Sequence, residues 1–168
     1  MTAMPETDGP VITTDPFALL LAAHQRVEEQ LSRLDAVAGT RKQRPTAPDE
    51  EVAGVVRSVL EFFAGPGARH QEAEDSVLLP RLAAIPAFAA MLPAIRAQHL
   101  MLAAELESLQ VAVSRGGDDL RALAGRFAEM HRGHLIAEEK VLFPLAAHEL
   151  TPAVKADLAR ELSDFASR

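Results

Sequence analysis

The sequence predicts an all-α protein, an up-down-up-down four-helix bundle with a short extra helix at its C-terminus. Apolar residues recur at alternating spacings of three and four along most of the chain, which is the period of a buried helical stripe. No segment shows the two-residue alternation of a half-buried strand. Helices joined by short connections pack antiparallel, so a bundle is the simplest architecture.

The helices of the first half are bounded by capping and turn residues. The first helix is expected to begin at Pro16, behind Asp15 as its N-cap, and to end near Gly39. A polar loop then leads to the second helix. Proline removes a backbone donor, so the sequence Gly-Pro-Gly at residues 65–67 is expected to kink this helix before it ends at Pro80.

The second half follows the same plan. The third helix is expected to stop at residues 116–117, which are both glycine. The fourth begins behind Asp118 or Asp119 and ends at Pro144, and Thr151 opens the short fifth helix. The inward stripe of the fourth helix comprises Leu120, Ala124, Phe127, His131, His134, Glu138 and Val141.

Length and composition indicate one globular domain. The chain has 168 residues, of which 48% are hydrophobic, and this is enough to bury a core. We expect a flexible tail at residues 1–14, the bundle at 15–146 and a C-terminal helix packed on it at 147–168. Because the chain has no Cys, any metal must be bound by nitrogen and oxygen atoms.

The charge of the chain disfavours two classes of partner. The formal net charge is −7, whereas nucleic acids and anionic membranes are held by clustered Lys and Arg, so we expect neither partner. Residues 1–15 contain no Lys or Arg, and the apolar segment after them therefore lacks the basic flank of a signal peptide. We expect a cytoplasmic protein. The sequence does not predict its oligomeric state.

The apolar stripes contain an unusual set of ionisable residues. The pattern requires Leu at the positions of His24, His99 and His134. In the second helix the pattern also requires Leu at the positions of His70 and Glu74. Burying such groups without partners costs several kcal/mol each, so we expect them to pair with one another or to bind a metal.

The helix ends place the four histidines at one depth of the bundle. Each lies six to ten residues from a helix boundary at the same end, or roughly 9–15 Å at the rise of an α-helix. Glu74 lies four residues after His70, and Glu138 four after His134, so each Glu shares a helix face with its His. Four imidazoles and two carboxylates suit two divalent ions, each bound by two His and bridged by both Glu.

The chain also repeats itself. The sequence HQEAEDSVLLP from His70 aligns with HLIAEEKVLFP from His134. More loosely, HQRVEEQLSRL from His24 aligns with HLMLAAELESL from His99. Each half is thus a helical hairpin that supplies one lone His and one His-x3-Glu. Two such hairpins related by an approximate two-fold axis would build a symmetric centre for two metal ions.

These residues resemble the hemerythrin-like HHE cation-binding family, whose helix bundle holds a non-haem di-iron centre. The resemblance covers about residues 15–146. It implies two iron ions joined by an oxo or hydroxo bridge, with the two glutamates as bridging carboxylates. The ligands that it implies are His24, His70, Glu74, His99, His134 and Glu138.

Two positions depart from the oxygen-carrying hemerythrins. Those proteins place a further His one turn after the third-helix ligand, where this chain has Ala103. They also use His-x4-Asp on the last helix, where this chain has His134 and Glu138. The sequence is thus more similar to bacterial HHE proteins. With one His fewer, the centre is expected to be more open to water or substrate.

Two other metal scaffolds find no support in the sequence. Ferritin-like di-iron sites use Glu-x-x-His, and no His here has a Glu three residues before it. The H-E-x-x-H pattern of zinc hydrolases is absent as well.

Several polar neighbours of the ligands have more than one interpretation. His131, one turn before His134, is either a metal ligand or proton donor of the site or a hydrogen-bonded core residue. Glu28 is either a metal contact or a surface residue. Three further acids are expected on the solvated surface or as hydrogen-bond acceptors behind the ligands: Glu72, Asp75 and Glu139. Of these, Glu139 is expected to turn toward water.

The function that these features predict concerns small ligands. A bridged pair of irons can change oxidation state and offer a vacant position, so O2, H2O2 and NO are the expected partners. No Tyr or Trp is present, which excludes a tyrosyl radical. The leading interpretation is a protein that binds or senses oxygen or reactive oxygen and nitrogen species. A catalase-like di-iron enzyme and an iron donor for iron–sulfur cluster repair are the alternatives, so enzyme activity is left open.

Overall fold

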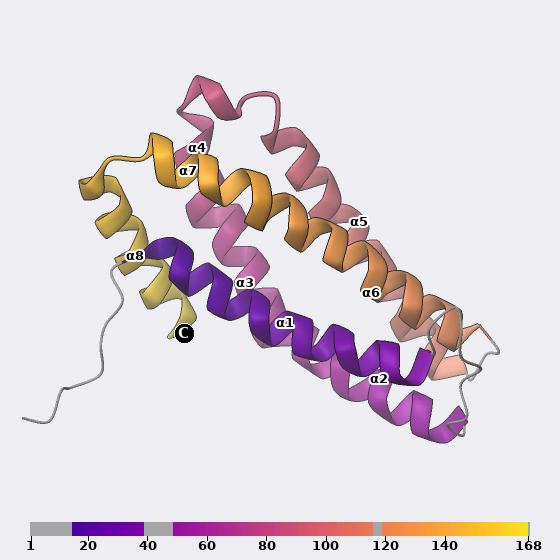
Figure 1. Ribbon diagram of the computed structural model, residues 1–168. Helices are drawn as coiled ribbons and strands as arrows, with labels where there is room; N and C mark the ends of the chain where they lie inside the picture. The colour runs from indigo at the N-terminus through magenta and orange to yellow at the C-terminus, as the bar shows by residue number, and fades with distance from the viewer. Residues whose placement is uncertain (1–14, 39–48, 116–118, 168) are drawn as a thin grey trace, which may run out of the picture.

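The computed structural model describes residues 15–38, 49–115 and 119–167, and the regular structure within them is entirely helical (Figure 1). The elements are α1 (Pro16–Ala38), α2 (Asp49–Ala64), α3 (Pro66–Ala73), η1 (Glu74–Leu78), α4 (Leu79–Ala83), η2 (Pro86–Phe88), α5 (Leu92–Arg115), α6 (Leu120–Ala137), η3 (Glu138–Leu142), α7 (Phe143–Glu149) and α8 (Pro152–Ala166). The predicted all-α fold class is confirmed. The predicted tail at 1–14, the helix stops at Gly39 and at 116–117, and the alternative cap Asp118 lie outside the described residues.

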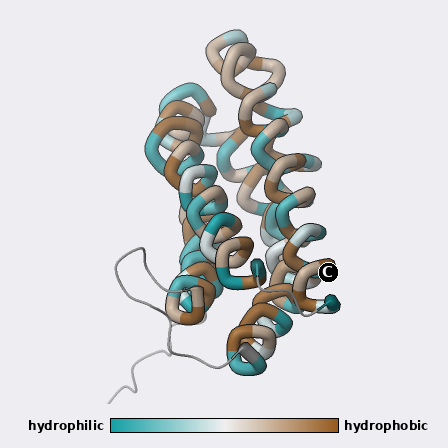
Figure 2. The backbone as a smooth tube through the Cα atoms, turned by 90° about the vertical axis from the view of Figure 1, so that its right-hand side faces the viewer, coloured by the Kyte–Doolittle hydropathy of each residue, from teal (hydrophilic) through white to brown (hydrophobic). Residues whose placement is uncertain are grey.

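The long helices lie side by side and alternate in direction (Figure 1). α1 and α5 each pack against both α2 and α6. α8 lies at one end of the bundle, against α1 and α3. Hydrophilic and hydrophobic residues follow one another in short runs along the helices, as expected where one helix face is buried (Figure 2). None of the described helices is long and apolar enough to cross a membrane.

Several predicted helix boundaries are confirmed. The backbone N–H of Phe17 donates to Oδ1 of Asp15 at 3.0 Å, so α1 begins behind an Asp cap. Oγ1 of Thr151 accepts from the N–H of Val154 at 3.4 Å and caps α8 in the same way. The second predicted helix breaks at Gly65, between α2 and α3, where a kink was predicted.

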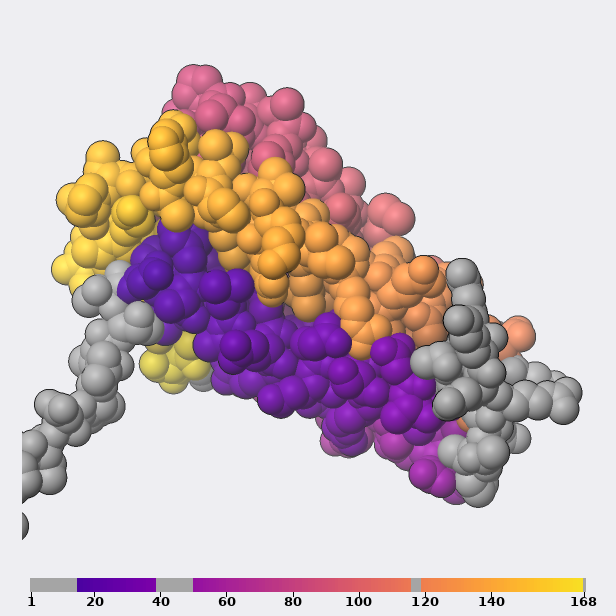
Figure 3. Space-filling model, viewed as in Figure 1, coloured from indigo at the N-terminus to yellow at the C-terminus, as the bar shows by residue number. Residues whose placement is uncertain are grey.

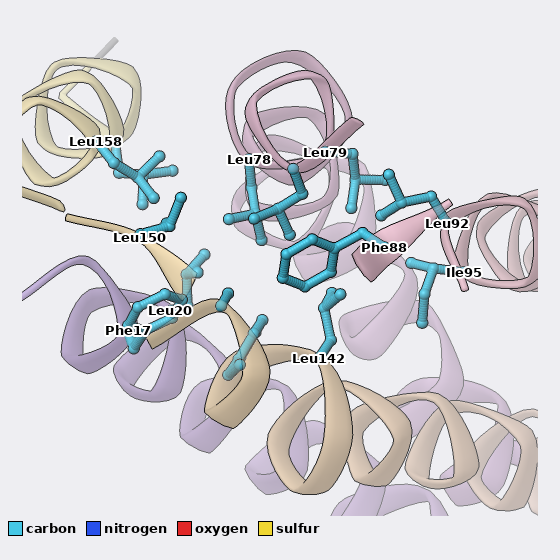
Figure 4. Packing of buried hydrophobic residues seen from close by; sticks show 14 of the residues in the cluster. Phe17, Leu20, Leu78, Leu79, Phe88, Leu92, Ile95, Leu142, Leu150 and Leu158 are labelled. Atoms are coloured by element: carbon cyan, nitrogen blue, oxygen red, sulfur yellow. The ribbon is translucent and has the colours of Figure 1, made fainter. Parts of the chain in front are cut away.

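Two apolar clusters fill the bundle, one on each side of the predicted histidine layer. The cluster that reaches α8 includes Leu20 and Phe88 (Figure 4). The other includes Val27 and Phe127. In α1, His24 lies between Leu20 of the first cluster and Val27 of the second. Apolar side chains therefore enclose the polar layer from both directions along the bundle axis.

Neither Pro80 nor Pro144 ends its helix, contrary to prediction. A turn of π-helix, η1 or η3, comes first in each case, and the helix then continues as α4 or α7. In η3 the N–H of Phe143 donates to the carbonyl of Glu138, five residues earlier, and η1 contains the corresponding bond. Because this wider turn leaves a carbonyl without its usual donor, a proline, which has no N–H, fits at the next position.

The π-turn of η3 also changes which side chain faces the core. The sequence periodicity predicts Val141 inward, but Val141 is 50% exposed and Leu142 is 0% exposed. The Leu142→Ala variant is expected to lose about 2–5 kcal/mol of unfolding free energy, because it leaves a cavity. Val141→Ala should change this free energy by less than about 0.5 kcal/mol. Urea titration measures both, and equal losses would contradict the shifted register.

Candidate metal centre

The bundle helices bring all six predicted ligands into one buried layer. They are His24 on α1, His70 on α3, Glu74 at the start of η1, His99 on α5, His134 on α6 and Glu138 at the start of η3. The His70 side chain is 11% exposed, and the others are at most 5% exposed. Both glutamates thus occupy the first position of a π-turn, a local distortion that is frequent at functional sites.

Glu74 lies between the histidines of the two hairpins. Its Oε1 is 3.3 Å from Nε2 of His70 and 3.5 Å from Nε2 of His24. The ring centroids of these two histidines are 4.9 Å apart. On the other side, Oε2 of Glu74 is 3.6 Å from Nε2 of His99. One carboxylate therefore faces both histidine pairs.

Glu138 also faces both histidine pairs, but its Oε2 alone contacts one histidine of each pair. Its Oε2 is 3.3 Å from Nε2 of His134 and 3.3 Å from Nε2 of His24. Its Oε1 is 3.7 Å from Nε2 of His99, whose ring centroid is 4.7 Å from that of His134. Both carboxylates are therefore placed where a bridge between two cations would stand.

The atoms that face the centre of the layer have no hydrogen-bond partner among the described residues. They are Nε2 of His24, Oε1 of Glu74, Nε2 of His99, and Oε1 and Oε2 of Glu138. A buried polar atom left unpaired costs about 1–3 kcal/mol. Ligand atoms within 4.8 Å of one another form two groups, one of Glu74, His99, His134 and Glu138 and one of His24, His70 and Glu74. Two cations that share Glu74 would satisfy these atoms, so the donor set fits a pair of metal ions.

Hydrogen bonds hold the outward ring nitrogens of three of the histidines. Nδ1–H of His24 donates to Oε1 of Glu139 at 2.9 Å. Nδ1–H of His99 donates to Oδ1 of Asp75, also at 2.9 Å. Since a carboxylate can only accept, each bond fixes a proton on Nδ1 and directs Nε2 toward the layer. Nδ1 of His134 is 3.0 Å from Oε1 of Gln98, a partner that the sequence did not indicate.

Of the two interpretations of Asp75 and Glu139, that of a hydrogen-bond acceptor behind a predicted ligand is confirmed, and the prediction that Glu139 turns toward water is wrong. Its side chain is only 29% exposed, and it bonds His24. Asp75 directly follows Glu74, and Glu139 directly follows Glu138; each contacts the lone His of the other hairpin. Glu72, in contrast, is exposed as expected. An acidic residue follows the Glu of both His-x3-Glu sequences, and this repetition is the feature of the sequence that indicates these hydrogen bonds.

The Glu139→Ala variant is expected to bind metal about 10–100-fold more weakly, because His24 loses the acceptor that orients its ring. Glu29→Ala is the control, since Glu29 is an exposed acid on α1. Competition titration with a chromophoric chelator and Co²⁺ measures both affinities. Equal affinities for the two variants would show that the hydrogen bond does not support the site.

The chain matches a known protein family over most of its length. The Hemerythrin HHE cation binding domain family matches residues 15–164. The chain belongs to this family. The match includes most of α8 as well as the bundle, and so extends past residue 146, where the resemblance seen in the sequence ends. No curated protein and no solved structure matches the chain.

In the metal-free HHE domain, the lone histidine of each hairpin has a raised pKa. Burial by itself lowers the pKa of His24, but the carboxylates of Glu138 and Glu74, 3.3 and 3.5 Å from its Nε2, outweigh burial and raise it to about 10. Burial likewise lowers the pKa of His99, and Glu138 and Asp75 raise it to about 9. Both imidazoles are therefore protonated at neutral pH.

The histidines of the two His-x3-Glu sequences behave oppositely. Burial lowers the pKa of His70 to about 3 and that of His134 to about 4, so both are neutral. Burial and the charge of Glu138 raise the pKa of Glu74. For Glu138 burial acts in the same sense, but the close approach of Nε2 of His24 and His99, at 3.3 and 3.7 Å, outweighs it and lowers the pKa. Each pair of histidines thus contains one protonated and one neutral imidazole.

His131 and Glu28 lie beside the HHE layer and belong to neither ligand group. His131 is 8% exposed, and its Nδ1 has no hydrogen-bond partner among the described residues. Its ring centroid lies 5.0 Å from that of Phe63 and 5.4 Å from that of Phe127. Burial lowers its pKa to about 3, so the ring is neutral. Glu28 accepts a hydrogen bond from Nε of Arg132 at 2.9 Å.

A cavity of ≈ 410 Å³ lies beside the layer, with walls from α3, α5 and α6. Three of the ligands line it, namely His70, Glu74 and His134. Ala103, which stands where the oxygen carriers have a further His, is exposed and lines it as well. The cavity therefore extends from exposed residues of the surface to three of the predicted ligands.

Proposed function

We propose that this HHE domain holds two iron ions and uses them to bind or sense oxygen or reactive oxygen and nitrogen species. The observation that carries the proposal is the buried layer of imidazoles and carboxylates, in which two ligand groups share Glu74. Nitrogen and carboxylate donors without thiolate suit both the ferrous and the ferric ion. The burial of the ligands favours a resident cofactor over iron that is passed to another protein.

The residues around the metals would have distinct tasks. One ion would be held by His24 and His70 and the other by His99 and His134, with Glu74 and Glu138 between them. When bound, the irons supply a redox couple and a position for a small ligand. Asp75 and Glu139 hold two of the ligand rings in orientation. The apolar clusters on both sides of the layer exclude bulk water.

A peroxide-decomposing enzyme is the second candidate, and the placement of His131 favours it. Conversion of two H2O2 molecules into two H2O and one O2 requires protons to move between oxygen atoms. His131 lines the cavity beside His134, and its Nδ1 has no partner among the described residues. An imidazole in this place can accept a proton from one peroxide oxygen and return it to another.

Metal analysis followed by ligand titration tests the proposal. Protein purified without added metal is expected to contain about two irons per chain. Under anaerobic conditions, O2, H2O2 and NO are then added in turn to the reduced protein, and its visible spectrum is recorded. A stable, reversible change with O2 or NO supports binding or sensing. Release of O2 from peroxide, lost in His134→Ala, would instead support the enzyme. One zinc and no iron would overturn both.

A further inference from the structure

The internal repeat allows the two faces of the metal layer to be compared position by position. His70 corresponds to His134, and His24 corresponds to His99. On this basis, the cavity between α3, α5 and α6 corresponds to a hollow of ≈ 420 Å³ between α1 and α6. If the repeat were perfect, both hollows would offer the same path to the metals. The two hollows differ in the side chains that line the route from the surface to the predicted ligands.

On the cavity side the wall carries small side chains. Ala68 and Ala103 both line the cavity, and both are exposed. Neither can form a hydrogen bond or an ion pair through its side chain. The cavity reaches three ligands, two histidines and one bridging glutamate. This face of the layer is therefore open.

On the opposite face, charged residues replace both alanines. The counterpart of Ala68 is Arg132, and the counterpart of Ala103 is Glu28. Nε of Arg132 is 2.9 Å from Oε1 of Glu28, and Nη1 is 2.6 Å from Oδ2 of Asp35. These ion pairs join α6 to α1, and the space-filling view shows the atoms of the two helices meeting side by side on this face (Figure 3). The hollow here touches one of the six ligands, His24.

A second asymmetry lies inside the open cavity. His131 corresponds to Gly67, and both residues line the same cavity. A Cβ atom at position 67 would lie 2.8 Å from Cδ1 of Phe63, so a larger residue would displace this ring. The imidazole of His131, 8% exposed, has Nδ1 without a partner among the described residues. The chain thus places a buried imidazole with an unpaired Nδ1 beside His134, in the open cavity.

We infer that small ligands reach the metals through the cavity walled by Ala68 and Ala103, and that His131 hydrogen-bonds to the ligand there. The ligand class is a small anion or an oxygen-derived molecule that binds a metal and retains a polar atom for the imidazole. The inference rests on the proposed function in requiring a metal-bound small molecule, although it does not require that the metal be iron.

The access route is tested by moving the ion pair from one face to the other. Azide is mixed with the Co²⁺-loaded protein, and the association rate is followed by the visible spectrum. The variant A68R/A103E places the Arg132–Glu28 pair across the open cavity and is expected to slow association at least about tenfold. The matched variant E28A/R132A removes the pair from the other face and should not slow it. Unchanged association in A68R/A103E, or equal slowing in both, would overturn the route.

The role of His131 is tested by the affinity of the same complex for azide. His131→Leu is expected to weaken binding by about 10–100-fold, the loss of a hydrogen bond to a charged ligand, with the cobalt content unchanged. His131→Gln keeps a donor and should recover most of the affinity. Leu and Gln variants that bind azide equally, or an unmodified protein that binds none, would refute the role. Iron content is measured separately. Absence of iron would refute the di-iron proposal but would leave the role of His131 to the azide measurement.

Discussion

The Glu74→Ala variant is expected to lose the paired site, falling from about two metal ions per chain to fewer than one. Glu74 belongs to both ligand groups. One of its oxygens faces His24 and His70, and the other faces His99. In the proposed two-ion site, truncation would remove a donor from both ions at once, together with one of the two buried carboxylates of the layer. Elemental analysis of protein purified without added metal measures the loss.

Glu72→Ala is the matched control, because Glu72 is an exposed acid on the same helix. It should retain full metal content. Thermal unfolding provides a second measurement, since a ligand present at 100 times its Kd stabilises the folded state by about 2.7 kcal/mol. A chelator should therefore lower the melting temperature of the unmodified protein and of Glu72→Ala, and leave that of Glu74→Ala unchanged. Full metal content in Glu74→Ala would exclude a bridging role.

The placement of the six ligands in one layer was predictable because its signals are local. His70 and Glu74 are one helical turn apart, and His134 and Glu138 repeat that spacing. The depth of each histidine followed from its spacing to a capping residue or a proline, and the estimate held although Pro80 and Pro144 do not end their helices, because each lies ten residues after its histidine. His24 showed itself as a polar residue in an apolar stripe. None of these arguments required knowledge of how side chains of different helices meet.

The contacts around the ligands depend on that knowledge, and the sequence left them open. Asp75 follows Glu74 directly and is rotated by about 100° around the helix, which indicates a surface position when the helix is taken alone. The structure brings it to His99 on α5, a contact between hairpins. The Arg132–Glu28 ion pair likewise joins α6 to α1. Such pairs are invisible to the periodicity of any single helix.

The π-turns account for the remaining errors. A pattern based on the α-helical period continues past Glu138 to Val141, whereas the extra residue of η3 turns Leu142 inward instead. The same turns accommodate Pro80 and Pro144, which would otherwise have ended their helices. The two π-turns begin at Glu74 and Glu138. The feature that the periodic pattern misses is thus located at two of the predicted metal ligands.

Metal uptake is expected to release about two protons per chain near neutral pH, because both lone histidines must lose a proton to bind a cation. In the metal-free layer the pKa of His24 is raised to about 10 and that of His99 to about 9. His70 and His134, with pKa values lowered to about 3 and 4, are already neutral. The overall affinity for two ions should therefore rise about 100-fold per pH unit between roughly pH 7 and 8.5 and flatten above about pH 10.

Titration of Co²⁺ into weakly buffered protein with a pH indicator counts these protons. Because the pKa of Glu74 is also raised, any proton on this carboxyl would add to the number released. His24→Gln should release about one proton fewer, whereas exposed His148→Gln should match the unmodified protein.

The same raised pKa values make the unfolding free energy of the metal-free protein depend on pH. Their contribution to stability is full below pH 6.5 and is lost as the pH rises through 9 to 10. That loss should occur only in the metal-free protein. Uptake without proton release would mean that the cation binds away from His24 and His99.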